Sequence, residues 1–331
     1  MITLGIECTA HTLGIGIVEE GRILSNIHDM YKPINEGILP RKAADHHAEV
    51  FVRVLQDNLN KAKMKMREID LIAFSQGPGI GAPLSVGISG AKYLAARHKK
   101  DIIGVNHPYA HVKISEHLTK LHDPLVLYVS GGNSQILVKE GEWYHVLGET
   151  LDIGIGNLFD TFGRTIGLEY AHGSVLEQLA KKGKYVELPF TVKGMNLVFS
   201  GLLTHASKLA TNGKHTKEDI TYSLMETAFA MSCEALERAL FLTKKKEIIV
   251  CGGVAQNRRL QNMLKAMADE DDARFGVAPD EFNRDNGAMI AYAGEVLYKK
   301  FGSRPLDFWK PITNYRIDRM KEIFIRTNKS V

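Results

Sequence analysis

The chain has 331 residues, of which 44% are hydrophobic and 24% are charged, a balance typical of globular proteins with a full hydrophobic core. Its length predicts about two domains or one large α/β unit. No apolar run approaches the ~18 residues of a membrane-spanning helix, and the first residues predict a strand without a basic leader, so we expect a cytoplasmic protein with no membrane partner. Cys8, Cys233 and Cys251 are scattered, which argues against a disulfide framework and a CxxC metal site.

The net charge of +4 is unevenly distributed. Residues 299–331 carry nine Lys and Arg against three acidic residues, which gives this segment a charge of +6 and the remainder −2. A basic segment on a near-neutral body suits a polyanion such as RNA. A solvated basic helix or tail explains the same charges equally well.

The first half of the chain predicts an α/β unit. Apolar runs at residues 2–9, 14–19 and 22–28, separated by turns, predict a β-meander of three strands. After it we expect a helix at 41–63, a buried strand at 69–74, a helix from 83 to about 99 and a strand at 102–105. The glycine-rich segment at 75–90 indicates a turn followed by a helix that packs closely on another backbone.

The strand at 102–105 leads into Asn-His-Pro-Tyr-Ala-His at 106–111. If a helix begins near Pro108, His107 and His111 share one helical face, with about 5–6 Å between their Cβ atoms. Two imidazoles so placed can chelate a divalent metal, although two histidines in a loop are equally compatible with polar surface. The stretch lacks the glutamate of HExxH motifs, which disfavours a metallopeptidase.

The second half repeats the plan of the first. Strands are expected at 124–129, 134–139 and 142–148, followed by helices at 216–243, 258–268 and 286–301 and strands at 247–251 and 275–277. Two meanders, each followed by strands and helices, predict an internally duplicated α/β protein. We expect one lobe at 1–122, with the segment 299–331 packing back on it, and a second lobe at 123–298.

Glycine-rich turns follow short apolar strands at 77–79, 130–133 and 252–255. Such turns let backbone N–H groups approach phosphates. None matches the Walker motif GxxxxGK[ST], and no GxGxxG follows the first strand, so the motifs indicate neither a Walker-type NTPase nor a dinucleotide dehydrogenase. Three turns spread over both halves favour a nucleotide between the lobes. Asp285, just before the last long helix, is either a third metal ligand or only an N-cap.

Five motifs occur in the order of a known family: Asn-His-Pro-Tyr-Ala-His (106–111), Tyr-Val-Ser-Gly-Gly-Asn (128–133), Phe-Ser-Gly-Leu-Leu-Thr (199–204), Gly-Gly-Val-Ala-Gln-Asn (252–257) and Asp-Asn-Gly-Ala-Met-Ile-Ala (285–291). Over about residues 1–320 the chain resembles the universal tRNA N6-threonylcarbamoyladenosine transferase family, once labelled O-sialoglycoprotein endopeptidase. It is most similar to the archaeal and eukaryotic branch, which works in the KEOPS complex. The resemblance implies the two-lobed α/β fold of actin, hsp70 and sugar kinases, with an interlobe cleft.

The resemblance also implies the chemistry. The threonylcarbamoyl group of threonylcarbamoyl-adenylate passes to N6 of the adenosine immediately 3′ of the anticodon in tRNAs that read A-starting codons, and AMP leaves. Iron(II), or alternatively zinc, would be bound by His107, His111 and, from the other lobe, Asp285. Glu7 and Thr9 would form a phosphate-side turn. The adenylate, or an ATP or AMP analogue, would be bound by Tyr128, Val129, Ser130, Gly131, Gly132, Asp160, Gly173, Glu177 and Asn257. The Tyr128 phenol would contact either the metal or this substrate.

Some positions depart from the family, and others bear on partners. Cys8 replaces a usual small residue, and Ala171-His172 stands where Pro-Gly is usual.

The implied partners are tRNA and KEOPS-type subunits, namely a small dimerising subunit, a kinase-like ATPase and a further small subunit. The alternative function is an ATPase or sugar kinase of the same fold, which needs a catalytic aspartate and no paired histidines. No general base stands out. We expect His46 and His47 on a surface helix face, and the candidates for RNA contact are Arg41, Lys42, Trp309 and Tyr315.

Overall fold

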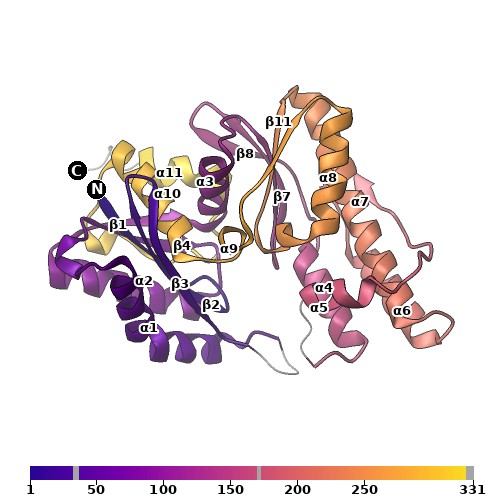
Figure 1. Cartoon of the computed structure of the whole chain (residues 1–331), viewed down its shortest axis with the longest axis horizontal. Helices are drawn as coiled ribbons and strands as arrows, with labels where there is room; N and C mark the ends of the chain where they lie inside the picture. Colours follow the sequence, from indigo (N-terminus) through magenta and orange to yellow (C-terminus); the bar gives the residue numbers. More distant parts are fainter. Residues whose placement is uncertain (33–36, 170–172, 326–331) are drawn as a thin grey trace. The chain divides into compact units, whose positions relative to one another are not determined.

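The computed structural model describes residues 1–32, 37–169 and 173–325, and the chain divides into two compact units. The first unit comprises Met1–Leu118 together with Arg284–Val331, and the second is Thr119–Asn283 (Figure 1). The sequence prediction therefore assigned residues 284–298 to the wrong lobe, because the helix at 287–301 packs on the first sheet. None of the helices in the described ranges has the length and apolar character that crossing a membrane requires.

The first unit is built on a five-stranded sheet with the order β3-β2-β1-β4-β5. The first three strands pair antiparallel as the predicted meander, whereas β4 and β5 run parallel to β1. The strands β1 and β4 are almost wholly buried, as expected of parallel strands covered on both faces. The bounds are β1 (Ile2–Glu7), β2 (Thr12–Glu19), β3 (Arg22–Met30), β4 (Leu71–Gly77) and β5 (Asp101–Asn106).

The second unit repeats this arrangement in the sheet β12-β11-β6-β7-β8. Its meander is again antiparallel, and β11 and β12 run parallel to the first strand of that meander. The two sheets therefore share one strand order, which confirms the predicted internal duplication. The bounds are β6 (Leu125–Val129), β7 (Ser134–Glu140), β8 (Trp143–Glu149), β11 (Glu247–Cys251) and β12 (Arg274–Val277), with a small ribbon of β9 (Val192–Lys193) and β10 (Asn196–Leu197).

The helices complete the two units. In the first unit α1 and α2 pack on each other and on the sheet, and α10 packs across β1, β2 and β4. In the second unit the long α7 contacts α5, α6 and α8 and begins at the predicted place, where the Thr216 hydroxyl accepts a hydrogen bond from the N–H of Asp219 at 3.1 Å. The bounds are α1 (Pro40–Ala62), α2 (Gly81–His98), α3 (His107–Thr119), α4 (Ile155–Thr165), α5 (Gly173–Ala180), α6 (Ser200–Asn212), α7 (Lys217–Thr243), α8 (Arg258–Glu270), α9 (Asp280–Asn283), α10 (Gly287–Phe301) and α11 (Met320–Ile325), with 3-10 turns η1 (Met66–Glu68), η2 (Gly253–Gln256), η3 (Leu306–Phe308) and η4 (Ile317–Arg319).

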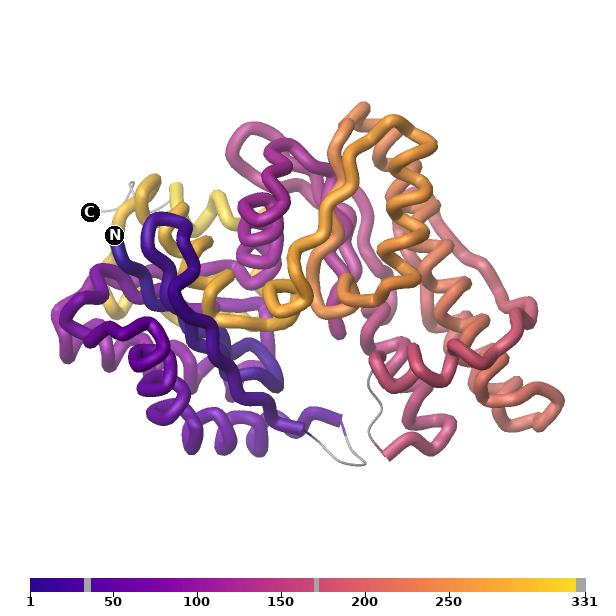
Figure 2. Tube along the Cα trace, viewed as in Figure 1, coloured from indigo at the N-terminus to yellow at the C-terminus, as the bar shows by residue number. Residues whose placement is uncertain are grey.

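Helix α10 lies directly against the first sheet because glycines line both surfaces. A Cβ on Gly16 would lie 2.2 Å from the backbone nitrogen of Ala288, and a Cβ on Gly287 would lie 2.2 Å from the nitrogen of Gly16. Figure 2 shows the yellow trace of this helix running beside the indigo strands of the same unit. The close contact fixes the start of α10 on the sheet, and Asp285 lies two residues before that start.

Three residues of the first unit are more buried than the sequence analysis expected. Trp309 is fully buried, with its ring edge-on to Phe74 at a centroid distance of 6.0 Å, and Tyr315 is 3% exposed. Neither ring can stack on an RNA base, so these two candidates for RNA contact were wrong. His47 is also buried, with Nε2 3.0 Å from the carbonyl oxygen of Ala10, instead of lying on the surface.

Candidate functional site

The paired histidines lie at the carboxyl edge of the first sheet. Strand β5 ends at Asn106, whose side-chain oxygen accepts a hydrogen bond from the N–H of Tyr109 at 3.0 Å and so stabilises the first turn of α3. The helix begins at His107, one residue before the start near Pro108 that the sequence interpretation assumed, and His111 follows one turn later. Both imidazoles are almost fully buried, at 6% and 0% exposure, which excludes the polar-surface interpretation of the pair.

The two imidazoles converge on one carboxylate. Nε2 of His107 lies 3.4 Å from Oδ1 of Asp285, and Nε2 of His111 lies 3.3 Å from the same oxygen. The potential ligand atoms of the three residues all lie within 4.8 Å of one another. Three ligands at about 2.1 Å from a tetrahedral metal lie about 3.4 Å apart, so the spacing fits a divalent metal. Two histidines and one carboxylate with open positions suit iron(II) or zinc.

Asp285 is a candidate ligand and does not cap α10. The neighbouring Asn286 is the N-cap, since its side-chain oxygen accepts a hydrogen bond from the N–H of Met289 at 2.9 Å. The N-cap alternative is therefore excluded, and the Asp285 carboxylate lies beside both histidines. Asp285 also belongs to the same unit as His107 and His111. The prediction that it comes from the other lobe was therefore wrong.

The charges around the cluster favour a bound cation. Burial disfavours protonated His107, but the negative charges of Glu7 and Asp285 outweigh burial and raise the pKa of His107 to about 10. Burial lowers the pKa of the neighbouring His111. Burial opposes ionisation of Asp285, yet the positive His107 holds the pKa of this carboxyl well below its usual range. The metal-free cluster thus holds one positive charge between two carboxylates, where a divalent metal can replace the proton.

The second unit carries two of the predicted glycine turns side by side. Strands β6 and β11 are parallel neighbours, with Cys251 opposite Tyr128, so the turns that follow them leave the same edge of the sheet. Gly252 has a φ of +96°, and a Cβ on it would lie 2.3 Å from the carbonyl oxygen of Val129. Only glycine fits position 252, which explains the first glycine of the pair at 252–253.

The turn after β6 is held by the first residues of α4. The N–H of Ser130 donates to the carbonyl of Asn133 at 2.8 Å, and the carbonyl of Ser130 accepts from the N–H of Gly156 at 3.1 Å. Within the described residues, the N–H groups of Gly131 and Gly132 donate to no protein group, and both glycines are exposed. These two N–H groups are therefore available to an anion, whereas the buried Tyr128 and Val129 belong to the strand beneath them.

The other predicted nucleotide contacts lie on neighbouring elements of the second unit. Asp160 lies on α4, and Gly173 and Glu177 lie on α5, which packs against α4. Asn257 caps α8, because its side-chain oxygen accepts hydrogen bonds from the N–H groups of Arg259 and Leu260 at 2.9 and 3.1 Å. That oxygen is therefore already engaged. The departure at Ala171-His172 falls outside the described residues.

The burial of the Asp160 carboxyl is unfavourable for its ionised form, which suggests a binding role. Burial raises the pKa of its carboxyl to about 6, although the charge of Arg164 opposes the shift, and no hydrogen bond reaches the carboxylate from the described part of the chain. Because the folded-state pKa lies above the ordinary value of about 3.9, the folded state loses stability as pH rises from about 4 to about 6. Buried acids of this kind are concentrated at binding sites.

We therefore expect Asp160→Asn to stabilise the protein at pH 7.5 by roughly 2 kcal/mol, a gain that shrinks as pH falls toward 4. Denaturant unfolding at several pH values measures the effect. The matched control is Asp269→Asn on α8, whose exposed carboxylate should give little change at any pH. An Asp160→Asn gain that does not vary with pH would contradict the assigned ionisation.

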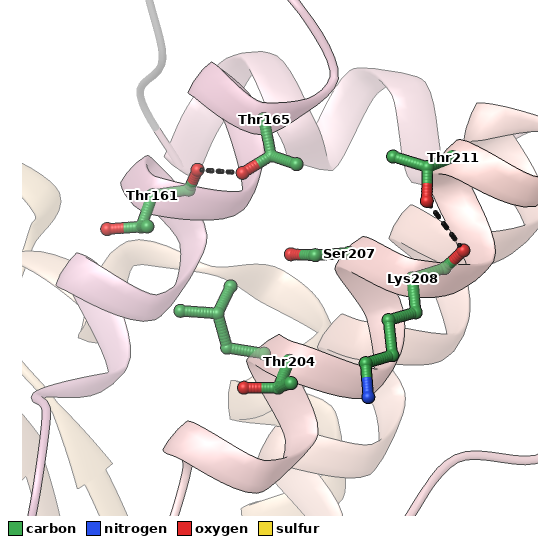
Figure 3. A pocket seen from close by; sticks show the side chains of 7 residues that line it. Thr161, Thr165, Thr204, Ser207, Lys208 and Thr211 are labelled. Atoms are coloured by element: carbon green, nitrogen blue, oxygen red, sulfur yellow. Dashed lines mark hydrogen bonds between the residues drawn. The ribbon is translucent and has the colours of Figure 1, made fainter.

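A groove of about 430 Å³ lies between α4 and α6, and Figure 3 shows the threonines that line it. The Thr165, Thr204 and Thr211 hydroxyls donate to carbonyls of their own helices, at 3.0, 2.9 and 2.9 Å, so these groups offer no free donor to an anion. None of the predicted nucleotide contacts lines the groove. Its lining residues are Thr161, Thr165, Leu203, Thr204, Ser207, Lys208 and Thr211.

With both sites described, the chain can be compared with known proteins. The family model for TsaD, tRNA N6-adenosine threonylcarbamoyltransferase, matches residues 21–292. The chain belongs to this family. A tRNA N6-adenosine threonylcarbamoyltransferase of Thermococcus sibiricus is 52% identical over 300 residues, which cover 90% of this chain and 92% of that relative. The family prediction made from the five motifs is therefore confirmed.

Two further similarities extend the comparison. A probable bifunctional tRNA threonylcarbamoyladenosine biosynthesis protein of Methanocaldococcus jannaschii is 49% identical over 331 residues, which cover 99% of this chain but only 61% of that longer relative. The crystal structure of HypF from T. kodakarensis superposes with a TM-score of 0.64 at 14% identity, covering 90% of this chain and 47% of HypF. At this identity HypF supports the fold alone, and together with the two equivalent sheets it confirms the actin/hsp70/sugar-kinase type.

Proposed function

We propose that this TsaD-family chain transfers the threonylcarbamoyl group of L-threonylcarbamoyl-adenylate to N6 of the adenosine immediately 3′ of the anticodon in tRNAs that read A-starting codons. The N6 nitrogen attacks the carbamoyl carbon, the bond from that carbon to the phosphate oxygen breaks, AMP leaves and N6 loses a proton. The match to the family over residues 21–292 carries the proposal. The donor and the tRNA position follow from the resemblance of the five motifs.

The first unit would hold one divalent metal through His107, His111 and Asp285, and we favour iron(II) over zinc. Support comes from the fit of the distances of 3.3 and 3.4 Å to a metal with two imidazoles and one carboxylate. Such an ion would supply a Lewis acid for the carbonyl or the leaving phosphate. Because His107 and His111 are almost fully buried, they would limit the access of water to such an ion.

In the second unit the turn after β6 would hold the phosphate of the adenylate. Gly131 and Gly132 support this role, because both are exposed and their N–H groups donate to no protein group among the described residues. Tyr128, Val129 and Ser130 would position that turn from the strand end. Asp160, Gly173 and Glu177 would contact the ribose and base, and Asn257 would contribute through its amide nitrogen, since its oxygen caps α8.

The N–H of Gly132 can be tested by a matched pair of variants. A Cβ on Gly132 meets nothing within 4 Å, so Gly132→Ala should keep both the loop and the affinity for the adenylate. Gly132→Pro removes the N–H and should weaken binding of a non-hydrolysable adenylate analogue by about tenfold, the effect of one charge-assisted hydrogen bond. Isothermal titration calorimetry measures both. Equal affinities for the two variants would show that the Gly132 N–H does not contact the ligand.

The reaction is tested by incubating the chain and the implied partner subunits with unmodified tRNA and threonine-labelled threonylcarbamoyl-adenylate. We expect label at the adenosine 3′ of the anticodon after nuclease digestion, and no label in a tRNA with guanosine at that position. Unlabelled tRNA accompanied by ATP hydrolysis or sugar phosphorylation would favour the alternative kinase-like function. Cleavage of a peptide substrate would favour the metallopeptidase.

We further propose that the chain acts with tRNA and with KEOPS-type subunits, namely a small dimerising subunit, a kinase-like ATPase and a further small subunit. The bifunctional relative of M. jannaschii supports a second activity working beside this one, because the chain matches only 61% of its length. The exposed Arg41 and Lys42 at the start of α1 remain candidates for tRNA contact. The cytoplasmic location expected from the sequence also stays a prediction.

A further inference from the structure

Glu7 is a fully buried acid whose two carboxylate oxygens are both engaged. Oε1 accepts hydrogen bonds from the N–H of Thr9 at 2.7 Å and from the Thr9 hydroxyl at 2.5 Å. Oε2 lies 2.9 Å from Nδ1 of His107. The resemblance had placed Glu7 and Thr9 at a phosphate-side turn, but a carboxylate with 0% exposure and filled on both oxygens is not directed at a phosphate.

The sheet explains why this acid reaches the histidine. Strands β1 and β5 run parallel with β4 between them, so Glu7 at the end of β1 and His107 just after β5 meet at the same edge. Neighbouring strands lie about 4.8 Å apart, so β1 and β5 are about 10 Å apart. The glutamate side chain, the imidazole and the 2.9 Å contact between them together span that separation. Thr9, in the turn that leaves β1, then fixes the second carboxylate oxygen.

The contact selects one arrangement of the His107 ring. When a metal replaces the second proton of His107, the proton that remains on Nδ1 is donated to Glu7. Nε2 then presents its lone pair on the side where Oδ1 of Asp285 lies, 3.4 Å away. Metal-binding histidines usually donate their other ring N–H to a carboxylate or carbonyl, which fixes the ring and raises its basicity. Glu7 has the position, the charge and the burial for that part.

We propose that Glu7 is a positioning residue of the metal centre, that it holds His107 as a ligand through Nε2, and that Thr9 holds Glu7 in turn. The proposal rests on the proposed metal centre of His107, His111 and Asp285. It assigns the buried acid at the end of β1 to the metal, not to the nucleotide. It also separates two effects, the geometry that Glu7 imposes on His107 and the negative charge that it brings.

Three variants separate geometry from charge. Glu7→Gln keeps the size and removes the charge, Glu7→Asp keeps the charge but is one methylene shorter and no longer reaches Nδ1, and Thr9→Val removes one of the two bonds to Oε1. Zinc affinity is measured by competition with a chromophoric chelator, and cobalt(II) substitution reports the ligand geometry by its visible absorption. Positioning predicts a 10–100-fold loss of zinc affinity for both Glu7 variants, a smaller loss for Thr9→Val and an altered cobalt spectrum.

The matched control is Glu116→Gln, which changes a buried acid on α3, the helix of His107, that is paired with Lys113 at 2.5 Å. It should bind zinc as the wild type does. Circular dichroism of the metal-free proteins checks folding, and if a Glu7 variant does not fold, Thr9→Val decides, because it leaves the carboxylate in place.

The outcomes distinguish this inference from the metal centre itself. If the wild type binds zinc stoichiometrically and the folded Glu7 variants bind it equally well, Glu7 does not position a ligand. A Glu7→Asp variant with wild-type affinity beside a weak Glu7→Gln would reduce the role of Glu7 to its charge and overturn the proposal. If the wild type binds no more zinc than His111→Ala, the metal centre is wrong, and the Glu7 inference fails with it.

Discussion

His111→Ala is expected to reduce metal affinity by more than about 100-fold and to abolish threonylcarbamoyl transfer, since loss of a ligand exceeds the 10–100-fold effect of an outer-shell change. His111 is fully buried, and its Nε2 lies 3.3 Å from Oδ1 of Asp285. Removing the imidazole would leave two of the three proposed ligands and an imidazole-sized void. Elemental analysis gives the metal content, and the tRNA-labelling assay gives the activity.

His145→Ala is the control for this experiment, because the His145 side chain on β8 is 50% exposed and belongs to the other unit. It should retain metal and activity. Asp285→Ala should behave as His111→Ala does. Undiminished iron or zinc in both His111→Ala and Asp285→Ala would remove the ligand assignment. Metal loss with full transfer activity would instead separate the metal from the reaction.

The second large effect is expected at the glycine contact between α10 and the first sheet. A Cβ on Gly16 would lie 2.2 Å from the nitrogen of Ala288 and 2.6 Å from its Cα, both backbone atoms that cannot move aside. Gly16→Val should therefore destabilise the protein by about 3 kcal/mol or more, at the upper end of overpacking effects. Because α10 begins two residues after Asp285, the same change should lower zinc affinity. Denaturant unfolding and zinc titration measure the two effects.

Gly201→Ala in α6 is the matched control, since a Cβ there meets nothing within 4 Å. Alanine in a helix should be neutral or slightly stabilising. A Gly16→Val protein as stable as the wild type would mean that α10 is not held against the sheet at the distance described. A destabilised protein with unchanged zinc affinity would mean that Asp285 keeps its place independently of α10.

The sequence predicted the repeated architecture well because alternation and turns are local signals. Both meanders, the buried strands β4 and β11 and the long α7 were found within a few residues of their observed bounds. The helix α4 was missed because the three glycines at 154, 156 and 163 weaken the helical pattern of the sequence. Tertiary packing stabilises the helix in spite of them. Its Gly154 and Gly156 instead allow the turn at Gly131 to approach within 3 Å of their Cβ positions.

The candidate site was predicted in part. Spacing identified His107 and His111, and the family resemblance added Asp285. Neither could tell that Asp285 belongs to the first unit, because that depends on the glycine contacts of α10. Nor could either give the role of Glu7, which depends on the parallel pairing of strands far apart in the sequence. The one available signal was an acid ending an otherwise apolar strand. Burial of Trp309 likewise depends on long-range packing.

The first unit is discontinuous in the chain, and this has a consequence for synthesis. Residues 119–283 must be translated before Asp285 and α10 can join the sheet formed by the first 118 residues. At about 5–20 residues per second the nascent sheet would wait on the order of ten seconds or more with the glycine-lined surface for α10 uncovered. Asp285, the third of the proposed ligands, therefore arrives last on the ribosome, and a nascent chain stalled in the second unit cannot complete the cluster of His107, His111 and Asp285.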